Sequence, residues 1–198
     1  MSVSVPDPFD QLSPAPARRR FTRAEYDRLV ADGFFDEDEK LELLDGEIVA
    51  MTPQGSAHSK AILRLNMLLA PALAGRAGVA VQLPFAASDD SEPEPDVFIL
   101  PLADISDDED HPSEALCVIE VAVTSQRRDR YKAGVFARAS VPQLILIDVP
   151  RRVALVHRAP RDGEYERIET VREGTPITID AFPDLSFDLA RVLPRAAG

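Results

Sequence analysis

A single glutamate lies inside a long apolar segment of this sequence. Residues 115–123 read ALCVIEVAV, and the β-branched side chains and the absence of any other charge predict a strand buried in a sheet. Burying a lone carboxylate among apolar neighbours is costly, so Glu120 needs a partner. This need makes Glu120 the strongest candidate for a site residue in the chain.

Turn signals and apolar spacing predict the elements of the N-terminal half. A capping box begins a helix expected over residues 23–32, and Asp45-Gly46 is the turn of a hairpin expected over residues 41–51. A broad apolar face predicts the main buried helix over residues 56–74. Pro71 should kink or shorten the last turn of this helix, because proline lacks a backbone donor.

The rest of the chain alternates apolar runs with one helical pattern. Strands are predicted over residues 79–86, 96–100, 115–123, 143–149 and 153–157, with peripheral strands at 165–171 and 176–179. A helix expected over residues 129–139 separates the third of these strands from the fourth. The predicted fold class is α/β, with a mixed β-sheet flanked by helices.

The length of the chain suits one domain. With 198 residues, of which 45% are hydrophobic, it can bury one full core, and we expect a single domain over residues 20–194. Residues 1–19 are rich in proline, serine and alanine without periodicity, which predicts a disordered tail or an arm on a partner subunit. No long apolar run and no secretory signal are present, so a cytoplasmic protein without a membrane partner is expected.

A second carboxylate, that of Asp96, opens the strand that precedes the strand of Glu120. Two carboxylates on adjacent strands repel each other unless a divalent cation lies between them, and an all-oxygen ligand set suits Mg²⁺ or Mn²⁺. Such an ion would lower the pKa of a bound water and neutralise a phosphoryl oxygen, as hydrolysis of a phosphodiester requires. The alternative for Asp96 is an ordinary polar residue at the start of a strand.

Five motifs follow one another in a specific order along the chain. They are Glu42-Leu43-Leu44-Asp45-Gly46-Glu47-Ile48, Met51-Thr52-Pro53 with His58, Pro95-Asp96-Val97, Val118-Ile119-Glu120-Val121, and Asp129 to Lys132 followed by Leu146-Ile147-Asp148. Together they resemble the Uma family of restriction endonucleases, part of the PD-(D/E)XK nuclease superfamily. The resemblance implies a restriction-endonuclease-like core, Asp96 and Glu120 as catalytic metal ligands, and Mg²⁺-dependent cleavage of DNA.

The resemblance also implies where the catalytic lysine lies. In the wider superfamily a lysine stands two residues after the glutamate, but that position here is Ala122. In the Uma family the following helix supplies the lysine instead, and Lys132 matches that position. Its ammonium would orient or deprotonate the attacking water, or stabilise charge on the phosphate. The alternative is a solvated lysine on a helix.

Three further residues are candidates by the same resemblance. Glu42 would bind the metal directly or through water, the alternative being a hairpin acid that faces solvent. His58 and Ser125 are expected to line the site or contact substrate, although His58 also suits a turn. A homodimer is expected from the resemblance and from the apolar residues 144–147.

The charge of the chain leaves other functions open. The net charge is −12, which is unfavourable for binding phosphates, but residues 121–158 carry eight basic and two acidic side chains, so either a local positive surface or scattered solvated arginines would fit. One alternative function is a catalytically inactive, acidic, dimeric interaction protein, which would bind no metal. Another is a phosphodiesterase that acts on RNA or on a small substrate.

Overall fold

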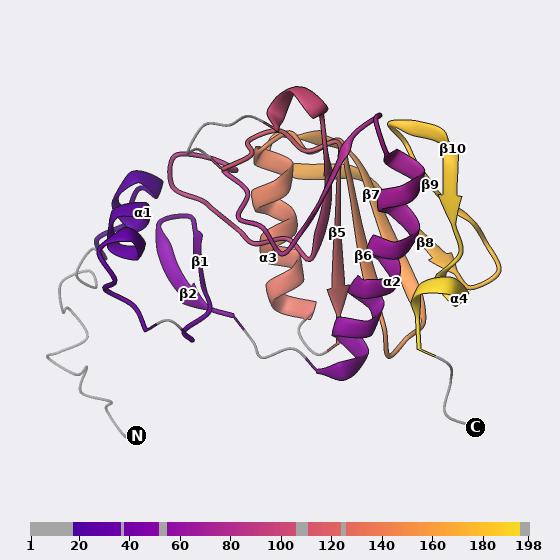
Figure 1. Ribbon diagram of the computed structural model, residues 1–198, viewed down its shortest axis with the longest axis horizontal. Coiled ribbons are helices and arrows are strands. Elements are labelled where there is room, and N and C mark those ends of the chain that lie inside the picture. The colour runs from indigo at the N-terminus through magenta and orange to yellow at the C-terminus, as the bar shows by residue number, and fades with distance from the viewer. Residues whose placement is uncertain (1–17, 37, 52–54, 106–110, 124–125, 195–198) are drawn as a thin grey trace, which may run out of the picture.

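A six-stranded sheet forms the centre of the protein in the computed structural model, which describes residues 18–36, 38–51, 55–105, 111–123 and 126–194 (Figure 1). The strand order is β3-β4-β5-β6-β7-β8. The strands are β3 (Gly78–Val81), β4 (Val97–Leu100), β5 (Cys117–Ala122), β6 (Gln143–Asp148), β7 (Val153–Arg161) and β8 (Glu164–Arg172). Only β5 and β6 pair in parallel, and the helix α3 (Gln126–Arg138) connects them as a crossover.

Two helices cover opposite faces of this sheet. Because side chains alternate along a strand, Ile119 of β5 packs in the core that contains Leu65 of the helix α2 (Ser56–Leu73), while Val118 packs in the core that contains Phe136 of α3. By the same alternation, the side chain of Glu120 lies on the face of α3. The sheet thus directs its one buried glutamate toward the crossover helix.

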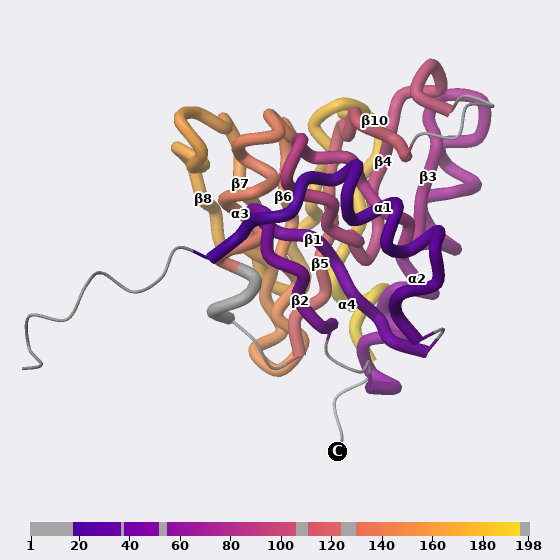
Figure 2. The backbone as a smooth tube through the Cα atoms, turned by 90° about the vertical axis from the view of Figure 1, so that its left-hand side faces the viewer, coloured from indigo at the N-terminus to yellow at the C-terminus, as the bar shows by residue number. Residues whose placement is uncertain are grey.

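A hairpin and a short helix form a further layer beside α3. The hairpin consists of β1 (Leu41–Leu44) and β2 (Glu47–Ala50), and the helix is α1 (Arg23–Ala31) (Figure 2). The turn between the strands requires positive φ at both Asp45 (47°) and Gly46 (75°), the conformation that the Asp-Gly pair favours. A side chain at Gly46 would also collide with Arg20, because an added Cβ would lie 2.5 Å from the Cβ of Arg20.

The C-terminal segment packs on the opposite side, against the core beneath α2. It contains β9 (Ile177–Ile179), β10 (Phe182–Phe187) and α4 (Leu189–Val192). Elsewhere in the chain, a 3₁₀ turn η1 (Leu102–Asp104) follows β4. The side chains of Ile179, Phe187 and Leu189 belong to the same buried cluster as those of α2. No helix in the described part of the chain is long and apolar enough to span a membrane.

The predicted α/β fold with a mixed, helix-flanked sheet is confirmed, and the deviations are local. The strand predicted over residues 79–86 ends at Val81 because Gln82 adopts a positive φ of 51°. Pro71 lies inside α2, and the helix continues past it to Leu73, one residue short of the predicted end. The short elements β10 and α4 were not predicted.

Candidate active site

Glu120 and Lys132 form the centre of a buried polar cluster. Because α3 packs on the face of the sheet that carries Glu120, Lys132 Nζ comes to 2.6 Å from Glu120 Oε1. Glu42 of β1 contacts the same ammonium, with Oε2 at 3.2 Å. All three residues are at most 8% exposed. The partner that Glu120 requires is therefore a lysine from another element.

Asp96 lies directly before β4 and joins the same region to α2. Its Oδ2 atom accepts a hydrogen bond of 2.7 Å from the backbone N–H of Val121 and lies 2.9 Å from Nε2 of His58. The first of these contacts ties Asp96 to the strand of Glu120, and the second ties it to the first turn of α2. Asp96 is also buried, at 6% exposure.

The segment before β4 completes the surroundings of the lysine. Lys132 Nζ donates to the carbonyl oxygen of Glu94 at 3.4 Å, and the backbone N–H of Glu94 donates to Glu42 Oε2 at 3.3 Å. On α3, Phe136 lies one turn after Lys132, and its ring centroid is 5.9 Å from the ammonium, within range of a cation–π contact. These contacts fix the ammonium in one place.

The protonation of the cluster follows from its burial. Burial raises the pKa of Glu120 to about 8, while the ammonium of Lys132 opposes this rise. Burial disfavours the charged form of Lys132, but the carboxylates of Glu120 and Glu42 outweigh this effect and raise the pKa of Lys132. Burial also raises the pKa of Glu94. Lys132 therefore stays protonated at neutral pH. For Glu120, the attraction to Lys132 does not offset the cost of burying the carboxylate, so its pKa stays above the ordinary value.

The cluster has more acidic groups than basic ones. The described cluster holds three buried carboxylates and one buried ammonium. Lys132 contacts Glu42 and Glu120, while Asp96 contacts His58 and the backbone N–H of Val121, so an excess of negative charge remains when all three acids are ionised. A divalent cation would balance this excess, and carboxylate oxygens are the protein ligands that Mg²⁺ prefers. The ligand types therefore suit Mg²⁺, whereas in the metal-free protein the described oxygens of these three carboxylates do not all lie within 4.8 Å of one another, and the ammonium of Lys132 contacts Glu42 and Glu120.

Comparison with known protein families shows which family the chain belongs to. The model of the family Uma2, described as "Putative restriction endonuclease", matches residues 23–190. The chain belongs to the Uma2 family. The resemblance expected from its ordered motifs is therefore confirmed.

A solved structure has the same fold as this Uma2 chain. It is the crystal structure of a "putative nuclease belonging to DUF820" from Anabaena variabilis, with a TM-score of 0.68 and 17% sequence identity, and the match covers 87% of this chain and 97% of that chain. No functionally curated protein matches the sequence.

The Uma2 chain brings most of its predicted site residues together. Glu42, His58, Asp96, Glu120 and Lys132 are connected through the ion pairs and hydrogen bonds described above. Ser125 lies outside the described residues, as do Thr52 and Pro53 of the second motif. The catalytic and metal-binding roles of these residues stay predictions.

Glu94 is the residue of this cluster that sequence reasoning missed. It stands two residues before Asp96 in the run Pro93-Glu94-Pro95, and its backbone rather than its side chain makes the contacts with Lys132 and Glu42. The flanking prolines Pro93 and Pro95 favour an extended backbone at Glu94, and this was the only sequence feature that pointed to the residue. A backbone contact leaves no other trace in the sequence.

Most of the basic side chains of segment 121–158 that the structure describes are paired with acids of the same chain. Five of the eight are in ion pairs with acids of this chain, namely Lys132, Arg138, Arg151, Arg152 and Arg158. Arg130 is exposed, and the side chains of Arg127 and Arg128 are outside the described set. Neutralisation within the chain therefore accounts for most of this local excess of basic residues.

The apolar run 144–147 gives no support to the expected homodimer. Its side chains lie in the central strand β6 and are almost fully buried against other elements of the same chain. Dimerisation therefore stays a prediction that rests on the family resemblance alone.

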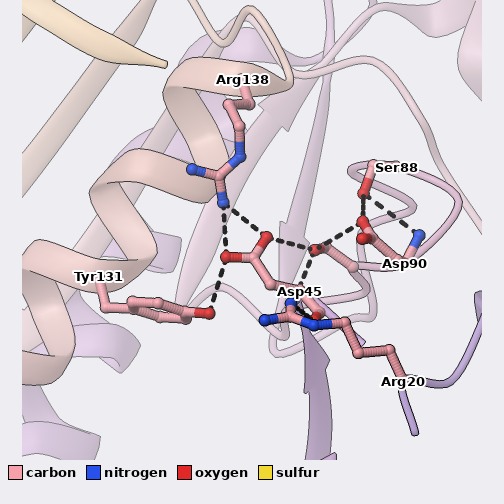
Figure 3. A network of polar contacts seen from close by, with 7 residues as sticks. Arg20, Asp45, Ser88, Asp90, Tyr131 and Arg138 are labelled. Carbon is pink, nitrogen blue, oxygen red and sulfur yellow. Dashed lines mark hydrogen bonds and ion pairs between the residues drawn. The ribbon is translucent and has the colours of Figure 1, made fainter. Parts of the chain in front are cut away.

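A polar clamp holds the hairpin of Glu42 against the helix of Lys132 (Figure 3). The carboxylate of Asp45, in the hairpin turn, accepts a hydrogen bond of 2.7 Å from the hydroxyl of Tyr131 and bonds of 2.6 and 2.8 Å from Arg138. Both donors belong to α3, and Arg20 also donates to the backbone carbonyl of Asp45. Burial favours the protonated form of Asp45, but the bonds from Tyr131 and Arg138 outweigh it and lower its pKa.

Asp45→Asn is expected to reduce the free energy of unfolding by about 2 kcal/mol at neutral pH, because it removes the charged partner of Arg138 while asparagine still tolerates the positive φ. Since the pKa of Asp45 is lowered by folding, its stabilisation is present above the unfolded-state pKa and is lost as the pH falls through the folded-state pKa. The difference between variant and wild type should shrink in acid. Denaturant unfolding at several pH values measures it.

Asp162→Asn is the matched control for this variant. Asp162 also precedes a glycine in a hairpin turn and has a φ of 50°, but its side chain is 95% exposed. Its substitution should change the free energy of unfolding by less than about 0.5 kcal/mol. Equal effects of the two substitutions would mean that the turn conformation, and not the clamp, accounts for the loss.

Proposed function

We propose that this Uma2 chain is a Mg²⁺-dependent endonuclease that hydrolyses DNA phosphodiester bonds. Asp96, Glu120 and Glu42 would hold the ion, for which Mn²⁺ is a substitute, and Lys132 would be the catalytic lysine. The observation that carries the proposal is the buried cluster of three carboxylates around one ammonium, which contacts Glu42 and Glu120 directly, with Asp96 tied to the strand of Glu120. The family description supports a nuclease-like activity.

A bound Mg²⁺ ion would supply Lewis-acid stabilisation of phosphoryl charge and a more acidic water. In the metal-free protein the carboxylates of Glu120 and Glu42 raise the pKa of Lys132, so its ammonium is available as a hydrogen-bond donor and a positive charge. Its proposed roles are orientation or deprotonation of the attacking water and stabilisation of charge on the phosphate. The contacts with Glu94 and Phe136 hold the ammonium for this task.

Asp96 and His58 form the second side of the proposed site. The backbone N–H of Val121 and the imidazole of His58 both contact Oδ2 of Asp96, so this carboxylate is oriented before any ligand arrives. His58 is a positioning residue in this arrangement. Its Nδ1 atom is buried and has no hydrogen-bond partner among the described residues.

The charge of the chain bears on which substrate it binds. The net charge of −12 and the internal ion pairs of segment 121–158 weaken long-range attraction to a polyanion. DNA is proposed on the strength of the family description. A homodimer, expected from the same resemblance, would present two such sites to one duplex.

The test combines calorimetric titration of Mg²⁺ and Mn²⁺ with cleavage assays on plasmid DNA, single-stranded DNA and RNA. We expect metal binding and DNA cleavage that a chelator abolishes. Metal-dependent cleavage of RNA but not of DNA would mean that the protein is a ribonuclease. Absence of binding at millimolar metal, together with absence of cleavage, would favour the inactive interaction protein.

A further inference from the structure

A second group of metal-ligating side chains lies outside the candidate active site. Asp27 of α1, Glu92 of the segment before β4, and His111 each offer one ligand atom, and these atoms lie within 4.8 Å of one another. The three residues come from segments far apart in the sequence. Chance proximity on one helix or in one acidic loop therefore does not explain the group.

Glu92 is the member of this group whose carboxylate is buried with one oxygen unpaired among the described residues. It is only 3% exposed, and its Oε1 atom lies 3.0 Å from Nδ1 of His111. Its other oxygen, Oε2, is buried without a hydrogen-bond partner among the described residues. The nearest cation is the guanidinium of Arg23 at 4.0 Å, too distant for a hydrogen bond. A buried carboxylate oxygen in this state is costly unless a further partner binds.

We propose that Asp27, Glu92 and His111 bind a divalent transition-metal ion of the Zn²⁺ class. One imidazole nitrogen and two carboxylates form a mixed ligand set that suits such ions better than Mg²⁺, which takes oxygen ligands. The 3.0 Å between His111 Nδ1 and Glu92 Oε1 is a hydrogen bond in the metal-free protein, and two ligands at about 2.1 Å from one tetrahedral ion lie about 3.4 Å apart, so binding replaces this bond with only a small separation of the two atoms. Solvent fills the remaining positions.

Access to this site is open on the side of α1. A pocket lined by Thr22, Arg23, Ala24, Asp27 and Asp89 adjoins the group and contains the side chain of Asp27. The guanidinium of Arg23, which also lines this pocket, lies 4.0 Å from Glu92 Oε2. The pocket thus gives solvent access to the Asp27 side of the group.

The site is connected to the layer that carries Glu42. The backbone N–H of Glu92 donates to the carbonyl oxygen of Leu43 at 2.7 Å, and the N–H of Leu43 donates back at 3.3 Å. Leu43 is the neighbour of Glu42 in β1. An ion at Glu92 would therefore fasten α1 and His111 to the strand that presents Glu42. This metal site does not rest on the proposed nuclease function.

The test is a calorimetric titration of Zn²⁺ into the full chain and its variants, with thermal unfolding measured in parallel. Glu120→Gln removes a ligand of the proposed magnesium site, so Zn²⁺ binding that remains in this variant reports the second site. We expect one Zn²⁺ per chain to bind Glu120→Gln protein and to raise its Tm. His111→Gln and Asp27→Asn, each made in that background, should bind Zn²⁺ at least tenfold more weakly and lose the rise in Tm.

Asp32→Asn is the matched control, since Asp32 is an exposed residue at the C-terminal cap of the same helix. It should bind Zn²⁺ as the Glu120→Gln background does. Because Asp27 lies on α1 near solvent, Asp27→Asn tests the site even where His111→Gln fails to fold. The proposal is overturned if Glu120→Gln protein binds no Zn²⁺, or if Asp27→Asn and His111→Gln leave the affinity unchanged.

Discussion

Glu120→Gln is expected to lower the rate of Mg²⁺-dependent cleavage by about 10³-fold or more and to weaken Mg²⁺ binding at least tenfold. The substitution keeps the shape of the side chain but removes the carboxylate that lies 2.6 Å from Lys132. A neutral amide is a poor Mg²⁺ ligand, and the remaining acids, Glu42 and Asp96, cannot supply the lost charge. Calorimetry and single-turnover cleavage measure the two effects.

Glu164→Gln is the control for this variant, because Glu164 is exposed at the start of β8. It should bind Mg²⁺ and cleave as the wild type does. Far-ultraviolet circular dichroism of both variants distinguishes loss of the site from loss of the fold. Normal cleavage by folded Glu120→Gln protein would remove Glu120 from the site.

Two of the candidate site residues could be recognised from the sequence because they are acids in or beside apolar strands. Glu120 inside β5 and Asp96 directly before β4 are readable because a charge in or beside an apolar strand is rare and costly. The position of Lys132 followed from the family resemblance, and the physical reason is visible only in the fold. The crossover between the parallel strands β5 and β6 places α3 on the face to which Glu120 points.

The contacts that align these elements were not predictable, because they join segments distant in sequence and involve ordinary surface residue types. Asp45 was read as a turn residue, and its pairing with Tyr131 and Arg138 depends on where α3 packs. His111 was given no role, and its approach to Glu92 depends on a loop. Tertiary packing, and not local propensity, decides such contacts.

Lys132→Met is expected to reduce turnover by about 10²- to 10⁴-fold without weakening Mg²⁺ binding. The ammonium contacts both Glu42 and Glu120, so in the metal-free protein it competes with an ion for the same carboxylates. Removing it should leave Mg²⁺ affinity equal or higher. The variant therefore separates the catalytic role of the lysine from metal binding, and parallel calorimetry and cleavage assays measure the two.

The metal-free Lys132→Met protein should also be less stable than the wild type by about 3–5 kcal/mol, because two buried carboxylates lose their cation. Mg²⁺ should restore much of this loss, since it supplies positive charge to the same groups. Lys60→Met, an exposed substitution on α2, is the matched control and should change neither turnover nor stability. Turnover within threefold of the wild type in Lys132→Met, with the stability loss present, would leave Lys132 a purely structural counter-ion of Glu42 and Glu120.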